Sequence, residues 1–128
     1  MNRIINITNH TMTAEQFKDA QLNLDVMEEL ALPENLRSLW GAVPPDADSV
    51  RDYVSPLLHW LSSVYEPSDI VWVQGEWGVT LSVVDWCRNR KIRCVYATTE
   101  RVAQEIHSPN GVQMSHVFRH VRFRNYFD

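Results

Sequence analysis

The stretch Ile70-Val71-Trp72-Val73-Gln74-Gly75-Glu76-Trp77-Gly78 is an apolar run that breaks into a turn bracketed by two glycines. A second apolar run, residues 92–97, ends just as abruptly at residues 98–101, Thr-Thr-Glu-Arg. Buried parallel strands read as continuous apolar runs, and open α/β sheets hold ligands beyond the carboxyl ends of such strands. The two turns are therefore the predicted place of function.

The pattern around these runs predicts an α/β fold. Helical spacing over residues 79–90 joins the two apolar runs into a βαβ unit, which favours a parallel sheet with a right-handed crossover. Residues 1–8 read as a first strand, and Thr13 with Gln16 forms a capping box for a helix to about Leu22. Further patterns predict an outer strand at 26–32, a helical turn at 33–40 and a helix from Ser49 to Val64 that Pro56 should kink.

The carboxyl-terminal part predicts a short helical turn to about Ile106, a loop at 108–111 and a final strand from Val112. Alternation along that strand divides its side chains between two faces. One face carries Val117, Arg119, Val121, Phe123 and Phe127, and the other carries Phe118, His120, Arg122, Arg124 and Tyr126. The first face is predicted to be half-buried. We expect one mostly parallel sheet with flanking helices and a carboxyl-terminal strand, in a single domain spanning residues 1–128.

Composition is that of a soluble globular protein. The chain has 128 residues, of which 45% are hydrophobic and 22% charged, and no apolar stretch is long enough to span a bilayer. The amino-terminal residues lack a signal-peptide pattern, so a cytoplasmic location is expected. Cys87 and Cys94 have no histidines at ligand spacing and are predicted to be reduced core residues, with no metal and no cofactor.

Charge is unevenly distributed along the chain. Residues 88–128 hold eight Lys or Arg and three Asp or Glu, a net of +5, whereas residues 1–87 hold four and thirteen, a net of −9. This asymmetry is compatible with an anion-binding face. However, Arg88, Arg90, Lys91 and Arg93 follow the end of a predicted helix, where cations also complement the helix dipole.

Two turns supply candidate ligand contacts. The first turn contains Gln74, Gly75, Trp77 and Gly78 and precedes a helix. The first amides of this helix, near residues 79 and 80, are expected to be free to bind a phosphate. A tight turn in which Glu76 only offsets the helix dipole explains the pattern equally well. The turn is neither a Walker loop nor a dinucleotide-binding fingerprint. Trp77 is the tryptophan best placed to stack on a ligand.

The ends of two other strands add polar side chains. Thr98 and Thr99 offer hydroxyls, and Arg101 offers a guanidinium, that can bind a phosphate. Alternatively, a threonine is the N-cap of a helix and Arg101 is an ordinary surface residue. The end of the first strand and the loop after it supply Thr8, Asn9, His10 and Thr11. Histidine exchanges protons near neutral pH, so His10 is a candidate acid or base, although a lone loop histidine is also commonly just solvated.

Short motifs spread over nearly the whole chain point to one family. They are His10 with Met12, Thr13, Glu15 and Gln16; Leu39 and Trp40 before Val43, Pro44 and Pro45; Val73, Gln74 and Gly75 with Gly78; residues 95–101, Val-Tyr-Ala-Thr-Thr-Glu-Arg; and residues 118–124, Phe-Arg-His-Val-Arg-Phe-Arg. Together these motifs resemble the small Csx-type accessory proteins of type III CRISPR loci.

The resemblance implies a Rossmann-like fold related to CARF domains, a homodimer, and a cyclic oligoadenylate bound across the twofold axis. It also implies a ring nuclease that cleaves cyclic tetra-adenylate to linear di-adenylate with a 2′,3′-cyclic phosphate, which would switch off the immune signal. Under this hypothesis His10 is the acid or base, Glu76 its reserve, and Arg101 a donor to the phosphate. The alternative is a module that binds the ring without cleaving it, either to sequester it or to sense it, and a third hypothesis is an unrelated phosphate-binding adaptor. No membrane or long nucleic acid is expected as a partner.

Overall fold

The computed structural model describes residues 1–127 and contains a five-stranded sheet with four helices. The elements are β1 (Asn2–Ile7), α1 (Ala14–Leu24), β2 (Val26–Ala31), α2 (Glu34–Gly41), α3 (Val50–Val64), β3 (Ile70–Val73), α4 (Trp77–Asn89), β4 (Arg93–Ser108) and β5 (Gly111–Asn125). Within residues 1–127, no helix is both long and apolar enough to cross a membrane.

The sheet has the order β2-β1-β3-β4-β5. β2, β1, β3 and β4 run parallel, and β5 pairs antiparallel with β4. The predicted mostly parallel sheet with a carboxyl-terminal strand is therefore confirmed, and the structure adds that this last strand is antiparallel. Because β1 lies beside β3, the loops after Ile7 and Val73 leave the sheet side by side at its carboxyl edge.

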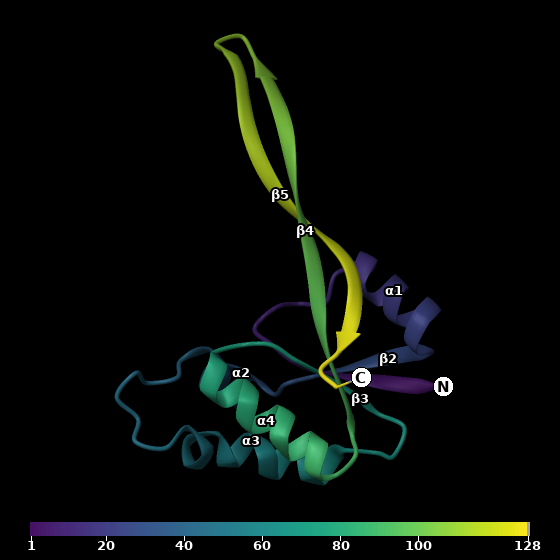
Figure 1. Cartoon of the computed structure of the whole chain (residues 1–128), viewed down its shortest axis with the longest axis vertical. Coiled ribbons are helices and arrows are strands. Elements are labelled where there is room, and N and C mark those ends of the chain that lie inside the picture. Colours follow the sequence, from purple (N-terminus) through teal and green to yellow (C-terminus); the bar gives the residue numbers. More distant parts are fainter. Residues whose placement is uncertain (128) are drawn as a thin grey trace.

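Helices cover both faces of the sheet, which explains why β3 is buried throughout and apolar at every position. On one face, Ala20 and Leu24 of α1 pack against Ile4, Trp72 and Phe123. On the other face, α2, α3 and α4 cover the alternate strand residues, and Trp40 and Trp86 lie in that core (Figure 1). Cys87 and Cys94 are buried and not disulfide-bonded, as predicted.

Two helix starts follow the capping residues in the sequence. Thr13 and Gln16 form the expected capping box, with each side chain bonded to the other residue's amide at 3.1 and 2.9 Å. The Ser49 hydroxyl accepts from the amide of Asp52 at the start of α3, and α3 runs unbroken through Pro56. α4 begins two residues before the predicted position, at Trp77.

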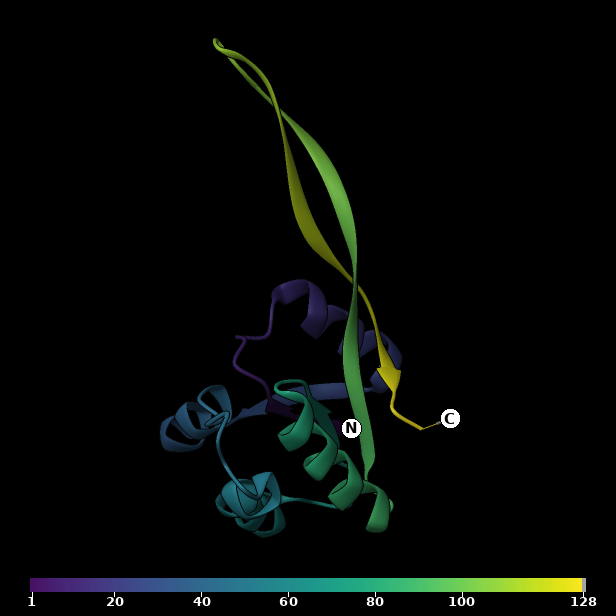
Figure 2. The same cartoon turned by 60° about the vertical axis from the view of Figure 1, so that its left-hand side comes forward.

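The sequence-based prediction fails where β4 leaves the sheet. Residues 98–101 were expected to form a turn and residues up to Ile106 a helical turn, but β4 continues as strand to Ser108 and returns as β5. Together the strands form a long two-stranded arm that projects far from the helices (Figures 1 and 2). We call residues 99–120 the arm. The expected turn near residues 108–111 is its tip.

The two faces of β5 also differ from the prediction. Thr98 pairs with Arg122 and Thr99 with His120, so Val121 is an extra residue, a β-bulge. A bulge reverses the alternation beyond it. His120 and Phe123, predicted on opposite faces, consequently lie together with ring centroids 5.0 Å apart.

Candidate functional site

A cavity of about 480 Å³ lies at the carboxyl edge of the sheet, where β1 and β3 end. Its lining combines the loop after β1, the turn after β3 and the end of α2. The residues are Asn9, His10, Trp40, Gly41, Val43, Gln74, Gly75 and Glu76. The structure therefore brings together the His10 loop and the glycine-bracketed turn, which are more than sixty positions apart in the sequence.

Hydrogen bonds hold the backbone of His10 in place. The buried Thr8 hydroxyl donates to Asn6 Oδ1 (2.7 Å) and accepts from the His10 amide (3.0 Å), while Asn6 Nδ2 donates to the His10 carbonyl (3.0 Å). The same Asn6 amide group donates to Glu29 on β2 (2.8 Å). The His10 side chain itself is exposed. Thr8, predicted to contact ligand, thus uses its hydroxyl to position His10.

The turn after β3 is closely packed against α2. The indole nitrogen of Trp40 donates to the Gln74 carbonyl at 3.0 Å. A Cβ atom on Gly75 would come within 2.6 to 2.8 Å of the Trp40 ring, closer than carbon atoms approach. The Gln74 side-chain oxygen accepts from Trp72 Nε1 and the Ala97 amide, so it fixes the turn rather than facing solvent. Gly75 is required here by this packing.

Glu76 is the N-cap of α4. Its Oε1 accepts from the Val79 amide at 3.0 Å, and its carbonyl accepts from the Thr80 amide at 3.0 Å. The expectation that the amides near residues 79 and 80 are free for a phosphate is therefore wrong. A carboxylate at the start of a helix accepts hydrogen bonds from the same amides, and offsets the same helix dipole, as a bound anion would.

A second cavity of about 330 Å³ adjoins the first on the other side of the turn. It is lined by Gln74, Gly75, Trp77, Thr80, Leu81 and Tyr126. The Trp77 side chain is 83% exposed. The Thr80 hydroxyl is buried and has no hydrogen-bond partner among residues 1–127. Sequence reasoning missed both Thr80 as a side-chain donor and Tyr126 as part of this edge.

Tyr126 ties the carboxyl terminus to the turn. Its hydroxyl donates to the carbonyl of Val73 at 2.6 Å, and its ring lies 4.8 Å from that of Tyr96. Burial, followed by the nearby Cys94 and Tyr96 side chains, raises the pKa of Tyr126 to about 12. The Tyr126 ring packs against the core on the α2–α4 side of the sheet.

The remaining predicted contacts, Thr98, Thr99 and Arg101, lie on β4 and line neither cavity. The Thr98 hydroxyl donates to the Arg122 carbonyl at 2.8 Å, within the arm base. Thr99 pairs with His120, and Arg101 pairs with Phe118. Thr11 lines a small cavity of about 130 Å³ beside His10, and Gly78 lies against Val50 of α3.

Comparison with known proteins places the chain in a family. Residues 2–124 match the family described as "Uncharacterized protein MJ1673 family". The chain belongs to the MJ1673 family. "Uncharacterized protein MJ1673" of Methanocaldococcus jannaschii is 33% identical over 126 residues, which cover 98% of each chain. No solved structure matches the chain.

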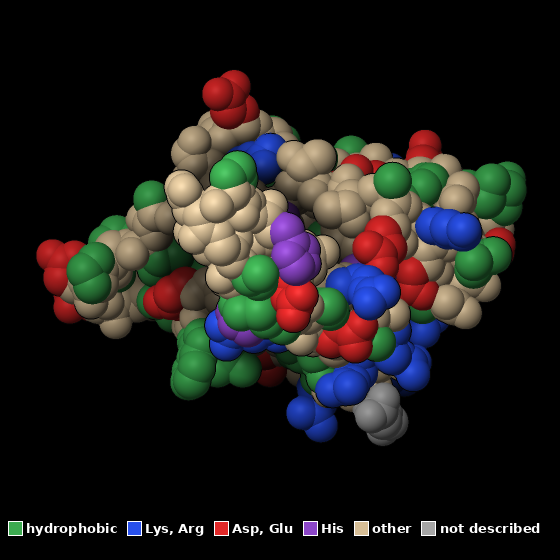
Figure 3. All heavy atoms as spheres, turned by 90° about the horizontal axis from the view of Figure 1, so that it is seen from above, with side chains coloured by type: hydrophobic (Ala, Val, Ile, Leu, Met, Phe, Trp, Pro, Cys, Tyr) green, Lys and Arg blue, Asp and Glu red, His purple; other side chains and the backbone are tan. Residues whose placement is uncertain are grey.

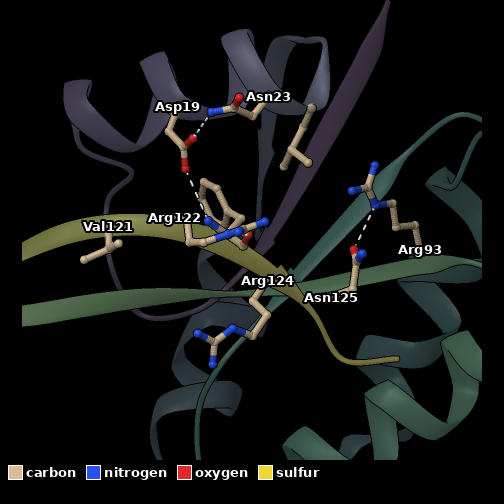
Figure 4. Close-up of a pocket in the computed structure, with 9 residues that line it drawn as sticks. Asp19, Asn23, Arg93, Val121, Arg122, Arg124 and Asn125 are labelled. Carbon is tan, nitrogen blue, oxygen red and sulfur yellow. Dashed lines mark hydrogen bonds between the residues drawn. The ribbon is translucent and has the colours of Figure 1, made fainter. Parts of the chain in front are cut away.

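This MJ1673-family protein has another pocket, of about 410 Å³, between α1 and the base of the arm. Asp19 and Asn23 of α1 lie on one side of this pocket, and Arg122 of β5 lies across from them, while Arg93 of β4 lies beside Asn125 of β5 (Figure 4). Arg93 Nε donates to Asn125 Oδ1 at 2.9 Å. No sequence pattern indicates this pocket, because α1 and β5, which form its two sides, are about one hundred positions apart.

Asp19 joins α1 to the arm base of the MJ1673-family protein. Its Oδ2 lies 2.7 Å from His120 Nε2 and accepts from the Phe123 amide, while Oδ1 accepts from Asn23. Burial alone would raise the pKa of Asp19, but the hydrogen bonds from His120, Asn23 and Phe123 outweigh it and hold that pKa below its usual value. Because the His120 side chain is only 5% exposed, this pair anchors the arm rather than reaching a ligand.

Two of the basic residues at the end of α4 contact aromatic rings of the same chain. The Arg90 guanidinium lies 3.9 Å from the centroid of the Trp86 ring, and that of Arg88 lies 5.3 Å from the Phe127 ring. Seen along the arm, Lys and Arg side chains gather on one side of the molecule (Figure 3). Residues 1–127 contain no cluster of three or more His, Cys, Asp or Glu placed to hold a metal ion.

Proposed function

We propose that this protein binds a cyclic oligoadenylate, cyclic tetra-adenylate, at the carboxyl edge of its sheet and cleaves it as a ring nuclease. The observation that carries the proposal is the cavity shared by His10 and the Gln74–Gly75 turn. Loops at the carboxyl ends of parallel strands are the usual ligand-binding place of open α/β sheets. Three of the motifs that resemble Csx-type proteins contribute to the lining of this cavity, through His10, through Trp40 and Val43, and through Gln74 and Gly75. A Rossmann-like, CARF-related fold is part of the same proposal.

His10 is proposed to move the proton in the cleavage step. A ribose 2′-hydroxyl loses its proton, and its oxygen attacks the adjacent phosphorus. The bond from phosphorus to the 5′-oxygen breaks, and that oxygen takes up a proton. The products are a 2′,3′-cyclic phosphate and a 5′-hydroxyl. His10 suits this role because its backbone is held by Asn6 and Thr8 while its side chain faces the cavity and solvent.

Adenine recognition is assigned to the neighbouring cavity. Trp77 presents an exposed indole on which a base can stack, and Thr80 and Leu81 line the same cavity. β4 continues beyond the same edge of the sheet. A ring that extends along β4 where it leaves the sheet would also contact Thr98, Thr99 and Arg101. Two subunits would present each set of contacts twice to a symmetric ring.

A binding module that holds the ring without cleaving it is the second candidate. The observation in its favour is the N-cap role of Glu76, because one oxygen of that carboxylate is already bonded to the Val79 amide. His10 is then left without a second acid or base among the residues that line the first cavity. In that case the wild-type protein binds cyclic tetra-adenylate and releases it intact.

Trp77→Ala tests the proposed ligand contact. Base stacking on an aromatic side chain contributes roughly 1 to 3 kcal/mol, so the variant should bind cyclic tetra-adenylate about 5- to 150-fold more weakly in isothermal titration calorimetry. Leu22→Ala is the matched control, since it removes another exposed apolar side chain, on α1. Equal affinity of the two variants and the wild type would remove Trp77 from the site.

A further inference from the structure

The arm lacks the partners that a β-ribbon needs. An isolated two-stranded hairpin is marginally stable in water. Beyond its base, however, the arm contacts no helix and extends alone from the molecule (Figures 1 and 2). Its strands have free edges without lysine, and proline occurs only at the tip, at position 109. Ten residues of strand span about 33 Å, so a large surface is left uncovered.

One face of the arm carries an apolar row. Register and alternation place Val112, Met114, His116 and Phe118 of β5 on this face. Phe118 is 73% exposed, Met114 60% and Val112 57%. Beside them on β4 stand Arg101, opposite Phe118, and Glu105, opposite Met114. We call this surface the Phe118 face. Exposed apolar rows rimmed by charge mark protein interaction sites.

We propose that the Phe118 face packs against the same face of a second copy of this chain. The face is self-complementary about Ala103 and His116, which pair with each other. A twofold axis across the strands at that pair places Arg101 against the partner's Glu105, and Phe118 against the partner's Met114. Each contact then occurs twice, as an isologous interface requires.

Several features favour a second copy over other partners. Residues 99–120 hold two acidic and two basic side chains, so the arm has no net positive charge for a nucleic acid or an anionic membrane. Arg101 has no ion-pair partner within residues 1–127, whereas Arg119 on the opposite face is paired with Glu100 at 3.3 Å. Glu105 lies 3.3 Å from His107 on the same face, and both side chains are exposed, so its carboxylate can also reach a partner's Arg101. The exposed Ala103 at the centre allows the two backbones to approach closely.

This inference goes beyond the proposed function and does not rest on it. The Gln74 turn lies beside Ala97, six strand residues or about 20 Å from the axis, so the arm interface is distinct from a shared ring site. Charge reversal tests the interface directly. Arg101→Glu and Glu105→Arg each create two like-charge contacts, so each should raise the dissociation constant of the dimer about tenfold or more. The double variant Arg101→Glu/Glu105→Arg restores opposite charges and should return the constant to within about threefold of wild type.

Analytical ultracentrifugation of the full chain measures these constants. The control is Arg119→Glu, the same charge change on the opposite face, which should leave the dimer unchanged. Circular dichroism checks that each variant is folded. A monomeric wild type, single reversals without effect, or no recovery in the double variant would each overturn the inference. Cleavage of cyclic tetra-adenylate is scored separately, so a dimer that leaves the ring intact contradicts the proposed function alone.

Discussion

His10→Ala should lower the rate of single-turnover cleavage of cyclic tetra-adenylate by about 10² to 10⁴ while ring binding changes little. General acid–base catalysis contributes roughly that factor. A residue that acts only in the transition state lowers the rate constant without weakening the substrate complex. Because Asn6 and Thr8 hold the His10 loop through backbone atoms of residue 10, loss of the imidazole should leave the loop in place.

Quenched time courses with enzyme in excess measure this rate, and calorimetry measures binding. His59→Ala is the matched control, since His59 is an exposed histidine on α3, outside both cavities of the carboxyl edge. Wild-type cleavage by His10→Ala would remove His10 from catalysis, leaving the reaction to positioning and electrostatics or to Glu76.

Asp69→Ala should lower the free energy of unfolding by about 3 kcal/mol, because it breaks a largely buried ion pair. The Arg3 guanidinium donates twice to this carboxylate, at 2.6 and 3.2 Å, and the Glu66 amide donates at 2.8 Å. The Asp69 side chain is 1% exposed and that of Arg3 17%. Removing the carboxylate leaves the guanidinium without its partner where β1 and β3 begin.

Urea denaturation followed by circular dichroism gives the free energies. Asp85→Ala is the comparison, since it breaks the Arg51–Asp85 pair, whose side chains are both about half exposed. Surface pairs contribute about 0 to 1 kcal/mol, so this variant should stay close to wild type. Equal losses in the two variants would show that burial of the Arg3–Asp69 pair adds nothing to stability.

The central sheet was predictable because its buried strands form continuous apolar runs in the sequence. β3 is apolar at all four positions since helices cover both of its faces, and this signal survives in the sequence. The arm gave no such signal. Beyond the contact of His120 with Asp19, nothing covers it within residues 1–127. Its strands mix polar and apolar residues, and their pairing joins positions up to 21 apart. Residues 102–106 then read equally well as a helical turn.

The candidate site was predictable only in part for the same reason. The order of the strands brings the His10 loop to the Gly75 turn, as expected for loops at the carboxyl ends of parallel strands. What sequence patterns did not reveal is which donors are already occupied. Glu76 takes the amides at the start of α4, and Thr98 is bonded within the arm base. The bulge at Val121 moved His120 next to Phe123, which spacing alone does not indicate.

Incubation of the purified wild-type protein with labelled cyclic tetra-adenylate in the presence of EDTA tests the central claim most directly. Chromatography then separates the ring from its linear products. The account predicts linear di-adenylate that ends in a 2′,3′-cyclic phosphate, formed by two symmetric cuts. Recovery of the ring intact after prolonged incubation with excess protein would contradict a ring nuclease, and if the ring is also not bound, it would contradict the proposed ligand as well.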